Sequence, residues 1–366
     1  MHLSRFFSLL LLPALLLGAG CAKNDPAPAP PPTVPPVAAP VVSLEQALRA
    51  DLNATVFLAA LRKTALLPAL SAPAAPLTVL APTNAAFAEL TGTPFTTAAS
   101  IEALPDAGPD VAELRRLVQY HLLPVQALSA MPAFERRTCP TLLPAADGTP
   151  LDVYIYNFAE GRLIVNGVRA ARALVAGQAA GGGWVHALDH VLRPPARTLA
   201  DELRERAEAP ATEFSLFWQA LQRPAAAPLL ALLTDAQLDH TLLLPTDAGL
   251  LLTLRQRNPA WTSLAAVPDA DLLHLLRLHF VPQAVPSTFL FHNEGRVATL
   301  AGGSDLASRL HFQGGFSHID GNDWHFTVTT ASGSSRRPGD APAQLLDIDQ
   351  LATNGLLHTL DLAIFP

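Results

Sequence analysis

Leu80-Ala81-Pro82-Thr83-Asn84 is the stretch that decides the fold, because the chain contains a second version of it. It follows a short apolar run, and Leu244-Pro245-Thr246-Asp247 repeats the same order after another apolar run. The two threonines lie 163 residues apart. A proline that fixes the backbone, followed by a threonine that can cap a helix, predicts a strand that turns sharply into a helix.

Two further matches occur in the same order along the chain. Tyr120-His121 corresponds to Leu278-His279, with an offset of 158 residues. Residues 185–194 correspond to residues 357–366, with an offset of 172 residues between His186 and His358. Three ordered matches at nearly constant offset indicate two copies of one domain of roughly 150–170 residues, an ordinary domain size. The period is too long for a solenoid.

Each copy places its helical patterns first and its strands later, which predicts the α+β class. In the first copy, we expect a helix over residues 109–120 and alternating strands from about residue 141, such as residues 151–156 and 162–165. In the second copy, we expect a helix over residues 269–280 and strands at residues 289–292 and 310–312. The predicted division is residues 43–195 for domain one and 198–366 for domain two.

Residues 1–20 have the pattern of an export leader. Arg5 precedes an apolar run of roughly 12 residues, which is too short to span a bilayer and fits a signal peptide. Gly18-Ala19-Gly20 then leads to Cys21, as in the lipobox of bacterial lipoproteins, with Gly18 where an apolar residue is usual. We therefore expect Cys21 to carry the lipid anchor, plain secretion being the alternative. The proline-rich residues 21–42 predict an extended tether.

Composition narrows the classes of function. The formal net charge is −7 and no cluster of Lys or Arg occurs, which argues against nucleic-acid binding. Half of the residues are apolar, enough for two cores. If Cys21 is lipidated, Cys139 has no partner for an intramolecular disulfide, so packing must hold the fold.

The motifs together resemble those of the fasciclin domain family. Residues 78–87, Tyr120-His121 and the pair of segments 163–167 and 183–192 resemble the family's three signatures in order. Domain two is more diverged, with Asp247 for the usual Asn, Leu250 for the usual Phe and Leu278 for the Tyr. The resemblance implies two tandem domains, each a small β-sandwich or wedge flanked by helices, with a role in adhesion.

The same resemblance nominates Tyr120, His121 and His279 as binding residues, since the central Tyr-His region has been proposed as a contact site in this family. A histidine at the end of an apolar helix also serves as a core or capping residue, and domain two keeps the His while losing the Tyr. Both interpretations stay open at this point.

Catalytic motifs do not emerge from the sequence: it has no Gly-x-Ser-x-Gly, His-Glu-x-x-His, P-loop or Gly-x-Gly-x-x-Gly. His311, His318 and His325 form the best metal-like set, through turns that could bring two of them together. Cys139, next to Arg136-Arg137, has no evident base as partner and is interpreted as an incidental thiol. We expect no catalytic residues, no resident metal and no cofactor.

The leading hypothesis is a non-enzymatic, lipid-anchored protein of the cell envelope, at the outer membrane and exposed on the surface, whose tandem domains contact a surface protein or polysaccharide. A second hypothesis is a periplasmic accessory or ligand-binding subunit of an outer-membrane complex. A third is a metal-dependent hydrolase that uses the region from His311 to His325.

Overall fold

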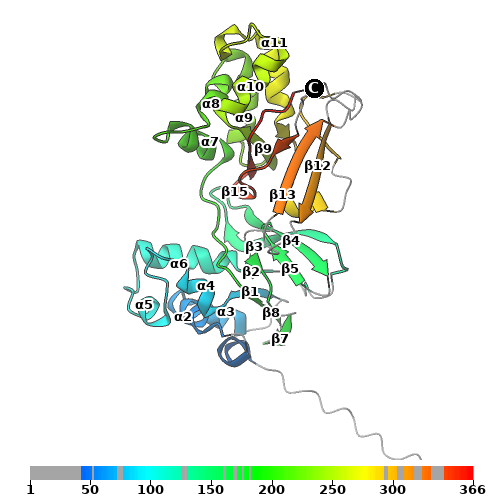
Figure 1. Ribbon diagram of the computed structural model, residues 1–366. Coiled ribbons are helices and arrows are strands. Elements are labelled where there is room, and N and C mark those ends of the chain that lie inside the picture. Colours follow the sequence, from blue (N-terminus) through cyan, green and yellow to red (C-terminus); the bar gives the residue numbers. More distant parts are fainter. Residues whose placement is uncertain are drawn as a thin grey trace, which may run out of the picture. The chain divides into compact units, whose positions relative to one another are not determined.

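The computed structural model shows a chain of helices and small sheets (Figure 1). It describes residues 43–51, 53–71, 77–124, 128, 131–159, 162–167, 171–174, 177–180, 183–291, 296–302, 309–316, 324–330 and 342–365. The predicted leader, Cys21 and most of the tether lie outside the described residues. Among the helices that the structure describes, none is both long and apolar enough to cross a bilayer.

The first domain contains helices before strand β1 and between β1 and β2, and strands thereafter. Its helices are α1 (Leu44–Gln46), the π-helical η1 (Ala47–Asp51), α2 (Thr55–Lys63), α3 (Leu67–Ser71), α4 (Asn84–Ala88), α5 (Ala98–Glu102) and α6 (Pro109–Tyr120). Its strands are β1 (Thr78–Pro82), β2 (Leu122–Leu123), β3 (Arg136–Pro144), β4 (Pro150–Ala159), β5 (Arg162–Val165), β6 (Ala171–Arg172), β7 (Gln178–Ala180) and β8 (Gly183–Leu188).

The second domain repeats this order. Its helices are α7 (Leu199–Glu208), α8 (Ser215–Leu221), the 3-10 helix η3 (Pro224–Ala226), α9 (Ala227–Thr234), α10 (Asp247–Arg257), η4 (Leu264–Ala266), α11 (Asp269–Leu278) and η5 (Ser287–Phe291). Its strands are β9 (His240–Pro245), β10 (Phe280–Val281), β11 (Arg296–Ala298), β12 (Arg309–Phe316), β13 (Trp324–Thr330), β14 (Ala343–Gln344), β15 (Gln350–Ala352) and β16 (Gly355–Leu360).

The sheets confirm the internal repeat. The first domain has sheets ordered β2-β1-β8-β7 and β3-β4-β5-β6, and the second has β10-β9-β16-β15 and β11-β12-β13-β14. In both, the strand before the Pro-Thr corner pairs in parallel with the closing strand, so that Leu80 lies opposite His186 and Leu243 opposite His358. The two signature segments of each copy, far apart in sequence, are therefore neighbours in one sheet.

Side chains on the central strand β1 explain the layers. Val79 and Ala81 belong to the apolar cluster that the helices form, whereas Leu80 belongs to the cluster between the two sheets. Successive side chains of a strand point to opposite faces of the sheet. Both faces of β1 are therefore buried, which explains why its sequence is a continuous apolar run. Leu242 and Leu243 divide in the same way in the second domain. Each domain thus has a helical layer and two sheets, in agreement with the α+β prediction.

The Pro-Thr-Asn corner stabilises two helices at once. Thr83 caps its own helix α4, because its hydroxyl oxygen accepts from the backbone N–H of Ala86 at 3.3 Å. Asn84 reaches back to α2, whose N-cap residue Ala54 offers no side-chain acceptor, and its amide oxygen accepts from the N–H of Val56 at 2.9 Å. The motif therefore supplies the hydrogen bonds that helix starts need.

Asp247 caps a preceding helix in the second domain, as Asn84 does in the first, but with a carboxylate. It accepts from the N–H and the hydroxyl of Ser215 and from the N–H of Leu216, at 2.7–3.1 Å, at the start of α8. A negative charge is favoured at a helix N-terminus. The replacement of Asn by Asp in the diverged copy thus keeps the cap.

Replacing Asp247 by Ala is expected to lower the free energy of unfolding by about 2 kcal/mol, because it leaves the first amides of α8 without an acceptor. Asp247→Asn, which restores the residue found at position 84, should stay within about 0.5 kcal/mol of the native chain. Urea unfolding followed by tryptophan fluorescence measures both. Equal losses for the two variants would contradict the capping role.

Several local predictions are confirmed, and two need correction. The helix predicted over residues 109–120 is α6, and the strand predicted over residues 310–312 lies within β12. The helix predicted over residues 269–280 ends at Leu278, because His279 forms its C-cap and Phe280 begins β10. The strand predicted over residues 289–292 is wrong, because residues 287–291 form the 3-10 helix η5. The Phe289 N–H donates to the carbonyl of Pro286 at 2.7 Å, a local bond that closes a turn instead of joining a ladder.

Candidate functional site

His121 lies at the C-terminal end of α6, immediately before β2. Its Nδ1 is 2.8 Å from the carbonyl of Leu117, and its Nε2 accepts from the N–H of Leu192 at 3.0 Å. These contacts define the tautomer: Nδ1 carries the proton and Nε2 does not. The ring is fully buried, and burial lowers its pKa to about 4. His121 is therefore a neutral bridge between the helix end and the segment after the closing strand.

His279 repeats this bridge atom for atom. Nδ1 is 2.8 Å from the carbonyl of Leu275, and Nε2 accepts from the N–H of Ile364 at 3.0 Å. Burial again lowers the pKa to about 4. Phe217 packs beside the ring at 5.5 Å between centroids, as Phe57 packs beside His121 at 5.7 Å. The two histidines have one structural role that both copies keep.

Tyr120 is also fully buried, in the same apolar cluster as Leu80. Its hydroxyl donates to the carbonyl of Asp152 at 2.9 Å and accepts from the side-chain amide of Asn166 at 3.2 Å. Burial raises its pKa well above the usual range. In the second domain Leu278 occupies the corresponding position and is equally buried.

The three residues nominated for binding are thus placed inside their domains, where a partner that docks on the folded surface does not touch them. Their burial shows that these three residues have a structural role, and their role in binding stays a prediction. A buried, neutral histidine with both nitrogens engaged also offers no free base for proton transfer.

His186 and His358, on the two closing strands, differ from each other. Nδ1 of His358 accepts from the N–H of Asp349 at 3.1 Å, and Nε2 lies 2.9 Å from the carbonyl of Val285. His186 is equally buried, yet neither of its ring nitrogens has a hydrogen-bond partner among the residues that the structure describes. Burial lowers the pKa of His186 to about 4.

Sequence reasoning missed the surface through which the two domains meet. Asp152, Tyr154 and Tyr156 lie on one face of β4, and Tyr156 packs into the core cluster of the second domain. The Arg136 guanidinium lies 5.5 Å from the Tyr156 ring centroid and 5.0 Å from that of Phe289. It also donates to the carbonyls of Thr288 and Phe289 at 3.2 and 3.3 Å. The signal was available: tyrosines on the face of β4 that points away from its own core.

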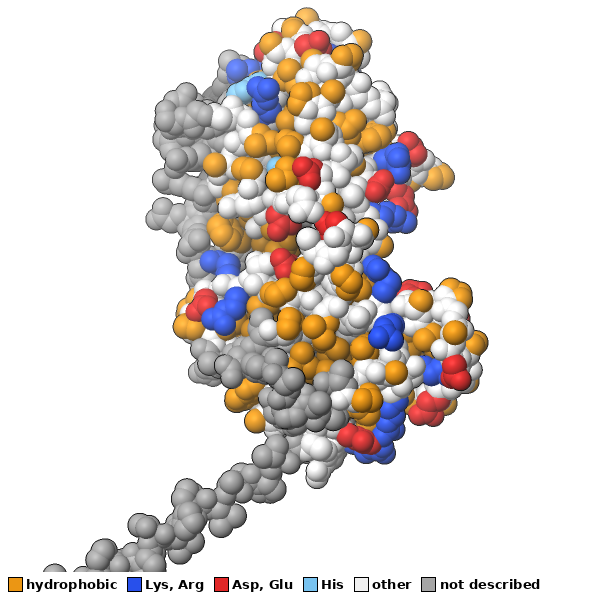
Figure 2. Space-filling model, turned by 180° about the vertical axis from the view of Figure 1, so that it is seen from behind, with side chains coloured by type: hydrophobic (Ala, Val, Ile, Leu, Met, Phe, Trp, Pro, Cys, Tyr) orange, Lys and Arg blue, Asp and Glu red, His pale blue; other side chains and the backbone are white. Residues whose placement is uncertain are grey.

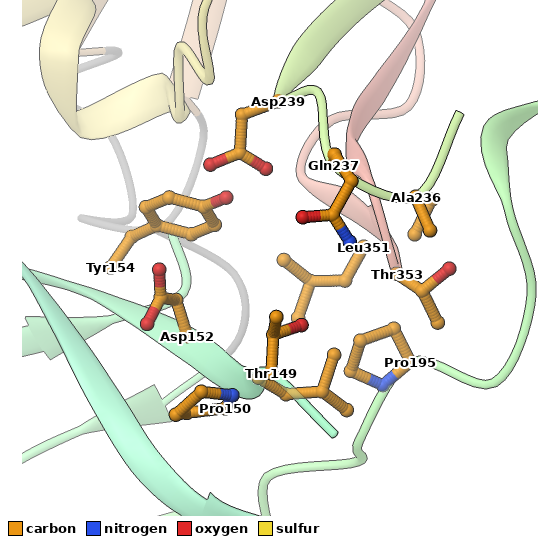
Figure 3. Close-up of a pocket in the computed structure, with 12 residues that line it drawn as sticks. Thr149, Pro150, Asp152, Tyr154, Pro195, Ala236, Gln237, Asp239, Leu351 and Thr353 are labelled. Carbon is orange, nitrogen blue, oxygen red and sulfur yellow. The ribbon is translucent and has the colours of Figure 1, made fainter. Parts of the chain in front are cut away.

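A cleft lies beside this contact, with groups from both domains in its walls (Figure 3). Its volume is about 200 Å³. Asp152 and Tyr154 come from β4, and Asp239 comes from the segment just before β9. The remaining walls are Thr149, Pro150, Leu151, Pro195, Ala236, Gln237, Leu351, Ala352 and Thr353.

Both carboxylates of this cleft have raised pKa values, although the charge of His240 partly offsets the rise at Asp239. Burial raises the pKa of Asp152, and the charge of Asp239 raises it further. Burial likewise raises the pKa of Asp239. Figure 3 shows the Tyr154 ring between the two acidic side chains. Burial raises the pKa of its hydroxyl, and the charges of Asp239 and Asp152 raise it further. Gln237 closes one rim and donates from its amide to the carboxylate of Asp147 in the first domain.

A second hollow of about 450 Å³ shares Tyr154 as a wall and is lined by Arg136, Arg137, Phe134 and Phe289 among others. Its cations are already engaged: Arg137 pairs with Glu135 at 2.6 Å, and Arg136 donates to the two carbonyls named above. On the face drawn in Figure 2, basic and acidic side chains are interspersed.

The metal-like histidines fall largely outside what the structure describes. His318 is not among the described residues. His311 lies on β12 opposite Thr329, and His325 lies on β13 opposite Gly315. These backbone positions are four ladder steps, about 14 Å, apart. Among the described residues, no group of three or more His, Cys, Asp or Glu is arranged to hold a metal ion.

Cys139 is a buried thiol on β3, and burial raises its pKa to about 11. We expect a thiol reagent to leave it unmodified for hours in the folded Cys21→Ser chain at pH 8, and to modify it within minutes in urea, because the thiolate is the reactive form. Mass spectrometry measures the labelled fraction, with Cys139→Ala as the control. Rapid labelling without denaturant would contradict its burial.

Comparison with known proteins defines the class. The family model of the fasciclin domain matches residues 52–194 and again residues 212–366. The chain belongs to the fasciclin domain family, with two copies in tandem. A solved structure of a FAS1 domain pair from the insect cell adhesion molecule fasciclin I covers 86% of this chain and 97% of its own, at 16% identity and a TM-score of 0.35. A search of curated proteins gave no match.

Proposed function

We propose that this chain is a non-enzymatic adhesion module, held at the cell envelope by a lipid on Cys21, that contacts a protein or polysaccharide of another surface. The observation that carries the proposal is the doubled fasciclin domain, a module typical of extracellular proteins. The leader and the cysteine after residues 18–20 support export and anchoring. The proline-rich segment 21–42 supports display at a distance from the membrane.

Contact between the domains supports a shared binding surface. Arg136 bonds to the second domain at two carbonyls, and the Cα hydrogens of Gly167 face the carboxylate of Asp349 so closely that a Cβ there would lie 2.0 Å from Oδ2. Many anchored copies acting together convert weak single contacts into firm attachment.

The proposal is tested with cells that carry the native gene, a deletion or the Cys21→Ser variant. Attachment and aggregation are expected to fall in the deletion and to return with the native chain only, since Cys21→Ser protein should be released into the soluble fraction. Attachment that is the same in all three strains would overturn the adhesive role. A Cys21→Ser chain that stays in the membrane fraction would overturn the anchor.

Protease treatment of intact cells separates surface display from the periplasmic alternative. Digestion of the native chain on whole cells is the result expected for an adhesin. Protection until the outer membrane is opened would favour an accessory or ligand-binding subunit of an outer-membrane complex, and co-purification with that complex at fixed stoichiometry would establish it.

A further inference from the structure

The cleft between the domains offers hydrogen-bond acceptors without a compensating cation. Asp152 and Asp239 contribute carboxylates, and none of the described residues that line the cleft is Lys or Arg. Ionised carboxylates only accept hydrogen bonds. Thr149 and Thr353 add hydroxyls that donate or accept. A ligand that brings hydrogen-bond donors and no negative charge is therefore favoured here, and an acidic ligand is repelled.

Asp152 gains from such donors because its side chain is partly buried. Burial, and after it the charge of Asp239, raises the pKa of Asp152, and burial deprives its charged form of the solvation that it has in water. A hydroxyl or ammonium group from a ligand supplies hydrogen bonds in place of lost water. Hydrogen bonds to charged groups are stronger than those between neutral groups.

The size and the aromatic wall narrow the ligand further. A volume of about 200 Å³ holds roughly six waters at about 30 Å³ each, which suits one small ring with several hydroxyls. Tyr154 offers a ring between the two acids (Figure 3), and Pro150 and Leu351 offer apolar surface for the C–H face of such a ring. The acceptors of the cleft match the hydroxyl groups of a sugar, and its apolar wall matches the C–H face of the sugar ring.

We propose that this cleft binds one non-acidic sugar unit of a surface polysaccharide, with Asp152 and Asp239 accepting from its hydroxyls and Tyr154 packing on its ring. This assignment rests on the proposed adhesive function and names the ligand class for it. Both domains supply the walls, so a single domain holds half of the site.

Calorimetric titration of the soluble Cys21→Ser chain tests the site directly. The probes are oligosaccharides of glucose, of N-acetylglucosamine and of galacturonic acid, at neutral pH. Binding is expected for at least one of the two non-acidic probes and not for the galacturonate. Asp152→Asn and Asp239→Asn are each expected to weaken it by ten-fold or more. Asp110→Asn, a charge-matched change at an exposed position on α6, should leave it unchanged.

Gln237→Ala supplies a second variant at the exposed rim, where folding is least disturbed, and thermal melting of every variant checks its fold. The inference is overturned if neither non-acidic probe binds at millimolar concentration, or if folded Asp152→Asn and Asp239→Asn chains bind as the native chain does. The titration uses purified protein and the attachment assay uses cells. If the purified chain binds the glycan but the deletion strain attaches normally, the adhesive role is overturned and the sugar site is not.

Discussion

Replacing Gly355 by alanine is expected to lower the free energy of unfolding by about 2–4 kcal/mol. Gly355 begins the closing strand β16 with φ +141°, and a Cβ there would lie 1.9 Å from the carbonyl oxygen of His240. That oxygen belongs to the parallel neighbour β9, so relief requires the two strands to separate. Overpacking costs about 1–3 kcal/mol, and the positive φ adds about 1 kcal/mol for a residue with a side chain.

Gly183 provides an independent second case in the first domain. A Cβ at Gly183 would lie 2.2 Å from the carbonyl oxygen of Leu77, the counterpart of His240. Gly183→Ala should therefore also destabilise the chain by about 2–3 kcal/mol. The matched control is Gly92→Ala, where φ is +81° but nothing lies within 4 Å of the added atom. This control isolates the backbone cost, about 1 kcal/mol.

Urea unfolding of the native chain and the three variants measures these differences. The close approach of β16 to β9 would be contradicted if Gly355→Ala cost no more than Gly92→Ala. The loss of stability should be larger for Gly355→Ala than for Gly183→Ala, because Gly355 is the one of these two glycines that combines the steric contact with a positive φ.

Local features of the fold could be predicted from the sequence because their causes lie within a few residues. Thr83 caps the helix that it precedes, and the helix at residues 109–120 begins with Pro109 at a position where its missing N–H costs nothing. The repeat itself emerged from motifs that recur at nearly constant offset. These were enough to predict two α+β domains of the fasciclin type, which the family match confirms.

The sites depended on contacts that spacing along the chain does not encode. His121 finds its second partner at Leu192, 71 residues away, and His279 finds its own at Ile364, 85 residues away. The cleft is further removed still, since Asp152 and Asp239 belong to different domains. The alternation of residues 151–156 carries a signal for which side chains of β4 leave the domain core, but only the second domain shows what they contact.

Acid is expected to destabilise the folded chain strongly between pH 6.5 and pH 4, through its buried histidines. The pKa values of His121, His186 and His279 fall to about 4 on burial, and burial also lowers the pKa of His240. Unfolding returns each to its ordinary value near 6.5. In that window the unfolded chain binds more protons than the folded chain, so the free energy of unfolding falls as the pH falls.

Each of the three most shifted histidines contributes about 3 kcal/mol to the free energy of unfolding above pH 6.5. This contribution is lost by about pH 4. Asp152 and Asp239 act in the opposite direction, because their raised pKa values let the folded chain take up protons first. Both are partly exposed to solvent, so solvent screening keeps their effect small. The histidines therefore determine the direction in which the free energy of unfolding changes with pH.

Urea midpoints at pH 7.5, 6.5, 5.5 and 4.5 measure the dependence. His279→Asn removes one titrating ring while keeping an amide donor near the carbonyl of Leu275, so its stability should be lower at pH 7.5 and less sensitive to acid. His274→Gln, at an exposed position on the same helix, should follow the native profile. A native midpoint that does not change from pH 7.5 to 4.5 would mean that these rings are protonated without cost, which is incompatible with a neutral bridge inside each domain.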